Sequence, residues 1–200
     1  MKVYQSIEKK VISGQPIYAF DKLDGSNIRA EWTPKGGFSK FGARRRLLDR
    51  NEQPLGEAVR LIEELTDDIA KRLKKERVEK ATCYFEFFGD GSFAGNHEDE
   101  DHRVVLFDID FYKKGLLPPK DFIKLTDGLP VPEMLYHGNA NSDFIRAVTN
   151  GTHPDVTYEG VVCKYLDKKI TRMFKIKSAA WLSRLKDKCA GDEELFKRLA

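Results

Sequence analysis

Four short segments place an ionisable side chain inside an apolar, strand-like stretch of the sequence. In chain order they are Lys22-Leu23-Asp24-Gly25, Phe85-Glu86-Phe87-Phe88-Gly89, Tyr158-Glu159-Gly160-Val161-Val162-Cys163-Lys164 and Phe174-Lys175-Ile176-Lys177. A single Lys or Glu in a strand usually faces solvent, so each segment alone indicates little. Side chains alternate along a strand, so Lys175 and Lys177 share one face and present two cations together. Lys22, between Asp21 and Asp24, belongs either to an exposed hairpin or to a reactive site.

Taken together and in this order, the segments resemble the motifs of the covalent nucleotidyltransferases. That superfamily comprises ATP-dependent RNA and DNA ligases and mRNA capping enzymes. Residues 22–25 are similar to its KxDG nucleophile motif, 85–89 to ExxG, 159–164 to EGxVxK and 175–177 to KxK. The stretch VVLFDID, residues 104–110, is similar to the apolar strand that lies between these motifs. The resemblance covers most of the chain and keeps every landmark in order.

The resemblance implies that Lys22 is a nucleophile. In this superfamily a lysine attacks the α-phosphate of ATP, expels pyrophosphate and becomes a lysyl-adenylate. The attacking amine must be neutral, whereas a free lysine has a pKa of about 10.4. Lys175 and Lys177, together with Mg²⁺ and desolvation, would lower the pKa of Lys22. The two cations would also hold the α-phosphate as negative charge reorganises around phosphorus.

Further nucleotide-binding residues are expected on the same resemblance. Mg²⁺ prefers oxygen ligands and keeps several waters, so Glu159 with nucleotide phosphates would suffice as its site, and Mn²⁺ could substitute. Glu86 would accept hydrogen bonds from the ribose hydroxyls, and Phe107 would stack on adenine, although its orientation is open. Arg44 would contact the phosphates, with Arg45 as the alternative. The full set expected to bind the cofactor is Asp24, Gly25, Asn27, Arg44, Glu86, Phe107, Lys164, Lys175 and Lys177.

The residues after the first motif bear on the type of enzyme. Ser26 and Asn27 follow KLDG directly, as in RNA ligases of the double-strand, nick-sealing type. DNA ligases usually carry a basic residue shortly after KxDG, and Arg29 comes late for that role. The resemblance therefore favours an ATP-dependent RNA ligase that transfers AMP to a 5′-phosphate and joins this end to a 3′-hydroxyl. An ATP-dependent DNA ligase, a capping-type guanylyltransferase and a non-catalytic RNA-binding relative stay open as alternatives.

The elements that would position these residues follow an α+β pattern. Strands are expected at residues 17–21, 27–32, 38–41, 82–88, 104–112, 158–165 and 170–177. Apolar residues from Leu55 to Leu73 recur at helical spacing and predict a long amphipathic helix over residues 54–80. Short helices are expected at 120–126 and 142–148. Strands paired through hairpins, with helices between the groups, predict antiparallel sheets rather than a βαβ alternation.

The end of the chain departs from the usual family pattern. Residues 1–177 are expected to form the nucleotidyltransferase domain, and residues 178–200 a helical extension packed on it and broken at Gly191. Ligases and capping enzymes usually continue after KxK into a further domain, but residues 178–200 are too few for an OB-fold. Joining would then use the catalytic domain's own surface or a partner that supplies the missing domain.

The charge composition leaves the expected partner open. With 35 basic and 32 acidic residues the net charge is only +3, which neither requires nor excludes nucleic acid. Basic residues cluster at 44–50 and 164–177 and could follow a phosphate backbone, whereas the run at 71–77 is typical of a solvated face. The expected substrate is nicked or ended RNA, with RNA/DNA and DNA duplexes as alternatives, bound by a monomer.

The cysteines and the hydropathy indicate the compartment. Cys83, Cys163 and Cys189 are far apart, odd in number and without a CxxC pair, as in reduced cytoplasmic proteins. No apolar run approaches the ~18 residues of a membrane-spanning helix. The protein is therefore expected to be cytoplasmic and to have no membrane partner.

Three other patterns are weaker. Residues 89–94 fit GxGxxA after a strand, but a dinucleotide-binding fingerprint should open an apolar helix, and a polar run follows instead. That run, residues 97–102, could bind a metal but is more typical of a loop. No GxxxxGK[ST] motif is present, which argues against P-loop chemistry.

Overall fold

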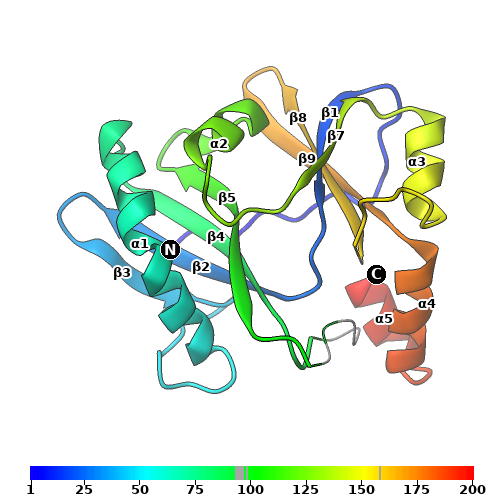
Figure 1. The fold of residues 1–200 in the computed structure, drawn as a ribbon, viewed down its shortest axis with the longest axis horizontal. Helices are drawn as coiled ribbons and strands as arrows, with labels where there is room; N and C mark the ends of the chain where they lie inside the picture. The colour runs from blue at the N-terminus through cyan, green and yellow to red at the C-terminus, as the bar shows by residue number, and fades with distance from the viewer. Residues whose placement is uncertain (93–96, 98, 158) are drawn as a thin grey trace.

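Two antiparallel β-sheets form the body of the protein (Figure 1). The computed structural model describes residues 1–92, 97, 99–157 and 159–200. The four-stranded sheet has the order β7 (Met134–Asn139), β1 (Pro16–Asp21), β8 (Gly160–Asp167) and β9 (Ile170–Lys177). The five-stranded sheet has the order β3 (Gly37–Gly42), β2 (Ser26–Thr33), β4 (Ala81–Phe88), β5 (Arg103–Phe111) and β6 (Gly115–Leu116).

Helices and sheets share two main cores. The described helices are α1 (Gly56–Lys75), α2 (Pro119–Leu125), α3 (Ser142–Thr149), α4 (Ala179–Lys188) and α5 (Glu193–Leu199). α1 and α2 share a core with the five-stranded sheet that includes Trp32, Ile62 and Phe122. α3 packs on the four-stranded sheet around Phe144 and Phe174. The α+β class with antiparallel sheets that the sequence predicts is confirmed.

The long helix α1 is shorter than the predicted range 54–80. It ends because Arg77 adopts a left-handed conformation, with φ of 54°. The N–H of Arg77 then donates to Lys74 O at 3.0 Å, and the N–H of Val78 donates to Leu73 O at 3.1 Å. This pair of reversed hydrogen bonds is a Schellman motif, which usually carries a glycine where this chain has Arg77.

Two strands were not predicted from the sequence. β6 has only two residues, which is too short for any periodic signal. β7 is the edge strand of its sheet and pairs with β1. Its sequence, MLYHGN, has no buried residue, so the apolar alternation that marks a half-buried strand is absent.

The sequence after β9 forms a helical pair with its own small core. The predicted break at Gly191 is confirmed, since that residue has φ of 87° between α4 and α5. The side chain of Ser178 accepts from the N–H of Trp181 and caps α4, and Asp192 caps α5 in the same way. Trp181 packs in the core of this pair, against which Phe196 lies partly buried.

Three of the sequence expectations fall partly outside the described residues. These are the GxGxxA pattern of residues 89–94 at its last two positions, the polar run of residues 97–102 at residue 98, and the predicted strand 158–165 at its first residue. None of the helices in the described part of the chain is long and apolar enough to cross a membrane. Cys83, Cys163 and Cys189 are free thiols, and all three are buried.

Candidate active site

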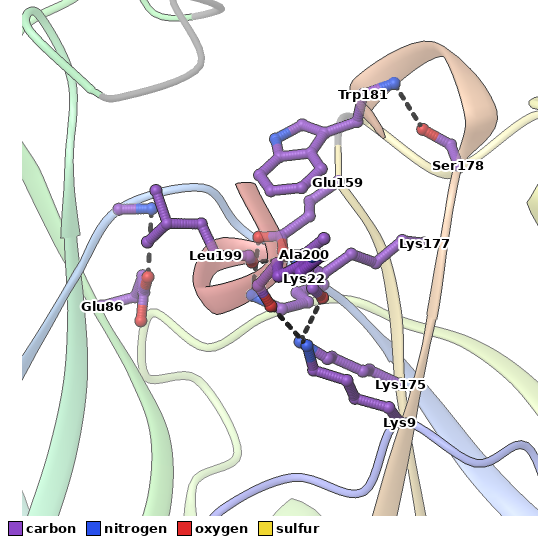
Figure 2. A network of polar contacts seen from close by, with 12 residues as sticks. Lys9, Lys22, Glu86, Glu159, Lys175, Lys177, Ser178, Trp181, Leu199 and Ala200 are labelled. Carbon is purple, nitrogen blue, oxygen red and sulfur yellow. Dashed lines mark hydrogen bonds and ion pairs between the residues drawn. The ribbon is translucent and has the colours of Figure 1, made fainter. Parts of the chain in front are cut away.

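One buried carboxylate joins two of the motif lysines. Glu159 Oε2 lies 2.6 Å from Lys22 Nζ, and Glu159 Oε1 lies 2.7 Å from Lys177 Nζ. The Glu159 side chain is only 5% exposed, whereas that of Lys22 is 20% exposed. Three segments that are distant in the sequence therefore meet at one point, and the nucleophile candidate keeps access to solvent (Figure 2).

The backbone around Gly160 brings these residues together. The N–H of Lys22 donates to Gly160 O at 2.9 Å, which fixes Lys22 beside the start of β8. Gly160 has φ of 134°, and a Cβ there would lie 2.0 Å from Ile176 O on β9. Only glycine permits this approach, and it brings the neighbouring Glu159 close to the end of β9. Gly160 of the EGxVxK motif is thus required for the close approach of β8 to β9.

Lys175 and Lys177 lie on the same face of β9, as predicted. Between and before them, Ile176 and Phe174 point into the core shared with α3. Burial, together with the charges of Lys177 and Lys22, lowers the pKa of Lys175 to about 8. Burial also lowers the pKa of Lys177, although Glu159 opposes the effect. The cations that the sequence predicts beside Lys22 are therefore present.

The expected lowering of the Lys22 pKa is wrong for this arrangement. Burial does act to lower the pKa of Lys22, but the carboxylates of Glu159 and Glu86 outweigh it, and the pKa is raised. Glu159 forms an ion pair with Lys22 itself, which the sequence does not indicate. An opposite charge at hydrogen-bond distance favours the ammonium form.

Glu86 lies across from the first motif. Its Oε1 accepts a hydrogen bond from the N–H of Gly25 at 3.0 Å. A Cβ on Gly25 would lie 2.3 Å from Phe87 O, so the glycine allows the KxDG turn to approach β4 closely. Burial raises the pKa of Glu86 to about 7, with Lys22 opposing and Glu159 adding to the effect. Asn27, the cross-strand neighbour of Glu86, has a buried Oδ1 without a hydrogen-bond partner among the described residues.

Lys164 lies away from this group, deep between the two sheets. Its Nζ is 2.9 Å from Asp108 Oδ2 and donates to Phe107 O at 2.8 Å. The side chains of Lys164 and Asp108 are 3% and 0% exposed. Tyr4 donates a further hydrogen bond to Asp108 at 2.6 Å. This lysine therefore links β8 to β5, and its predicted contact with the nucleotide stays a prediction.

Phe107 is held by a contact that sequence reasoning missed. It is the extra residue of a β-bulge, because Leu106 pairs with Phe85 and Asp108 pairs with Tyr84. The ring of Phe107 is half-buried and meets the ring of Tyr4 edge-to-face at 5.0 Å between centroids. Tyr4 belongs to the N-terminal segment, which carries no pattern that would have identified it.

The other predicted residues vary in their placement. Asp24 is buried in the KxDG turn, between Lys22 and Gly25. Arg44 and Arg45 both lie exposed in the turn that follows β3, so the structure does not choose between them.

The donor set near Lys22 fits a hard cation only in part. The described residues contain no cluster of three or more His, Cys, Asp or Glu side chains that could hold a metal ion. Glu159 offers two hard, buried oxygens, which suits Mg²⁺ when phosphate oxygens and water complete its shell. Both oxygens contact lysines in this structure, so an incoming cation would compete with Lys22 or Lys177 for Glu159.

Comparison with protein families shows the family to which this chain belongs. A family model of RNA ligase matches residues 15–177, which include every motif segment from Lys22 to Lys177. The chain belongs to the RNA ligase family. The match ends at the last residue of β9, so α4 and α5 lie beyond the part that the family model describes.

Solved RNA ligase structures share the fold. A Naegleria gruberi RNA ligase variant with ATP and Mn has a TM-score of 0.63 at 21% identity, covering 92% of this chain and 59% of that one. An apo variant of the same ligase has a TM-score of 0.65 at 22% identity, covering 92% and 58%. A structure of that ligase with PPi has a TM-score of 0.60 at 22% identity, covering 88% and 53%. The present chain thus spans little more than half the length of these ligases, and no curated protein matches it.

Proposed function

We propose that this protein is an ATP-dependent RNA ligase in which Lys22 carries AMP as a covalent intermediate. The observation that carries the proposal is the carboxylate of Glu159 in contact with both Lys22 and Lys177. A lysine with solvent access, a buried carboxylate and a second cation are the groups that nucleotidyl transfer to an amine needs. Their position within the range matched by the RNA ligase family supports this chemistry over an exposed hairpin.

The reaction proceeds in three transfers at phosphorus. Lys22 Nζ first loses a proton to solvent, to which its side chain is 20% exposed. It then attacks the α-phosphorus of ATP, an N–P bond forms, and pyrophosphate leaves with the electron pair of the broken P–O bond. An oxygen of an RNA 5′-phosphate then attacks the same phosphorus, which forms a P–O–P linkage and releases the lysine. Finally a 3′-hydroxyl attacks the phosphorus of the former 5′-phosphate, and AMP leaves with the electron pair of the broken bond.

The residues around Lys22 would bind different groups of ATP. Lys175 and Lys177 would hold the α-phosphate, and Glu86 would accept hydrogen bonds from the ribose hydroxyls. Asn27, whose Oδ1 has no partner in the described residues, would contact the nucleotide or the 5′-phosphate end. Glu159 would hold Mg²⁺ or Mn²⁺, which stabilises negative charge on the phosphates. The Naegleria gruberi structures with ATP and Mn, and with AMP and Mn, support this choice of cosubstrate and metal.

RNA is preferred over DNA as the substrate. The supporting features are Ser26 and Asn27 directly after the KLDG motif and the RNA ligase family match. Arg29, the one basic residue near that motif, is buried and donates to Ala43 O at 2.9 Å, so it is committed to the fold. We further propose a monomer that acts in the cytoplasm, with residues 1–177 as the transferase domain and 178–200 as an extension.

A joining assay tests this proposal. The protein is incubated with α-labelled ATP and Mg²⁺, and a nicked duplex with a 5′-phosphate is then added, either with RNA strands or entirely of DNA. The expected result is a labelled protein band that loses its label to the RNA duplex, followed by sealing. Label transfer from GTP instead of ATP would identify a capping-type enzyme, and equal sealing of all-DNA nicks would identify a DNA ligase. The absence of any labelled band would leave only a non-catalytic relative.

A further inference from the structure

The last turn of α5 lies on the lysines of the candidate active site (Figure 2). Lys175 Nζ donates to the main-chain oxygen of Ala200 at 2.9 Å, and Lys177 Nζ donates to that of Leu199 at 2.8 Å. From the N-terminal segment, Lys9 Nζ donates to Lys197 O at 2.9 Å. Three ammonium groups thus converge on one helix end.

The end of a helix is suited to bind cations. Its last main-chain oxygens lack partners within the helix, and the helix dipole makes this end negative. In this structure, lysines of β9 and of the N-terminal segment donate to the main-chain oxygens of the last turn of α5. Packing of Leu195 and Phe196 against the core of α4 holds α5 in place, and Lys177 Nζ also lies 4.0 Å from the centre of the Trp181 ring on α4.

These contacts conflict with nucleotide binding. Lys175 and Lys177 are the cations assigned above to the α-phosphate, and in this structure both donate to α5. A phosphate oxygen carries negative charge and forms a stronger hydrogen bond with the ammonium group of Lys177 than the carbonyl of Leu199 does. ATP would therefore compete with the helix end for the same donors.

We propose that α5 is a built-in inhibitor, whose C-terminal turn occupies the phosphate-binding lysines and must leave them before ATP can bind. This inference rests on the proposed function. Since only the open form accepts the nucleotide, the apparent affinity for ATP is reduced by the fraction of molecules that are open. Whatever holds α5 away from the lysines would activate the enzyme.

Hydrogen–deuterium exchange of the protein tests the release. The probe is an ATP analogue with a methylene group between the α- and β-phosphorus atoms, so that binding occurs without transfer. We expect amide exchange in residues 195–200 to rise when the analogue binds, because α5 loses its lysine contacts. Residues 142–149 of α3 serve as the internal reference and should not change.

A pair of variants on α5 tests the competition. Phe196→Ala weakens the packing of α5 and should tighten analogue binding roughly tenfold, since loss of a partly buried ring shifts such a docking equilibrium by about that factor. Glu194→Ala changes an exposed side chain of the same helix and should bind like the wild type.

The outcomes separate this inference from the proposed function. Analogue binding with unchanged or stronger protection of residues 195–200 would overturn the inference and leave the ligase proposal standing. If folded Phe196→Ala bound the analogue no more tightly than the wild type, this would also overturn the inference and leave the ligase proposal standing. If neither the wild type nor this variant bound the analogue, the ligase proposal would fail and the inference with it. Binding by the variant alone would support the inference.

Discussion

Two lysine–carboxylate pairs, Lys164 with Asp108 and Lys22 with Glu159, differ in their burial and in their other partners. Lys164 and Asp108 are 3% and 0% exposed, and each has further partners in Phe107 O and Tyr4. Lys22 is 20% exposed, and its partner Glu159 is shared with Lys177. The sealed pair is complete without a ligand, whereas the other gathers two ammonium groups around one carboxylate.

The difference indicates which lysine is available for reaction. A fully buried ion pair is costly to break, because the remaining charge has no solvent. A pair near the surface can exchange its partner for a metal ion or a phosphate at little cost. The EGxVxK motif thus supplies one residue of each kind, with Glu159 in the exchangeable cluster and Lys164 in the fixed pair.

Lys22→Ala should separate the two pairs most strongly. We expect formation of the labelled protein to fall by at least about a thousandfold, because the proposed nucleophile is removed. The free energy of unfolding should change by less than about 1 kcal/mol, because Lys177 still pairs with the buried Glu159. Label transfer and urea denaturation measure the two effects, and Lys22→Arg is the control that keeps the charge. Appreciable label on Lys22→Arg would contradict this assignment.

Asp108→Asn should have its main effect on the stability of the fold, in contrast to Lys22→Ala. Removing one charge of the sealed pair leaves Lys164 uncompensated and should lower the free energy of unfolding by about 3 kcal/mol. The double variant Asp108→Asn, Lys164→Met should recover part of that loss, because no unpaired charge is left. Denaturant titration of the three proteins checks this. A double variant less stable than the single one would show that Lys164 does more than neutralise Asp108.

Glu86→Gln tests whether the pKa of the Glu86 carboxyl is raised in the folded protein. Burial raises the pKa of Glu86 from its ordinary value of 4.5 to about 7. Protonated Glu86 therefore contributes its full stability to the fold below about pH 4.5. This contribution is lost as the pH rises through about 7. The variant cannot ionise. It should be more stable than the wild type by about 2 kcal/mol near pH 8, allowing for partial exposure, and little different near pH 4.5. A difference that does not vary with pH would refute the shift.

Tyr4→Phe should give the smallest effect. It removes the hydroxyl that donates to Asp108 but keeps the ring that contacts Phe107. Loss of one hydrogen bond to a charged group should lower the free energy of unfolding by about 1–2 kcal/mol. The KM for ATP should stay within about twofold of the wild type if Phe107 keeps its place, since the ring contact is retained. Tyr4→Ala is the comparison, in which loss of the ring should raise that KM.

Much of the fold could be predicted because its signals are local. The strand at residues 170–177 is correct at both ends, since the apolar residues alternate with lysines over its second half. The helix at 54–80 was predicted too long, because nothing in the sequence signals that Arg77 would adopt a left-handed conformation. β7 was missed because an exposed edge strand has no apolar alternation.

The candidate site was predictable as a set of residues but not as a set of contacts. The motif order identified Lys22, Glu159 and Lys177, which the structure brings together. It could not show that Glu159 would raise the pKa of Lys22, or that α5 would reach the lysines of β9. Those contacts join residues that are far apart in the sequence, and no periodic pattern of side chains predicts them.

Peptide mapping by mass spectrometry tests the central claim most directly. The wild-type protein is incubated with ATP and Mg²⁺, digested under conditions that preserve phosphoramidates, and searched for peptides that carry AMP. The account predicts AMP on the peptide containing Lys22, attached to that side chain. A modification on another lysine, such as Lys164, Lys175 or Lys177, or no modification at all, would contradict it.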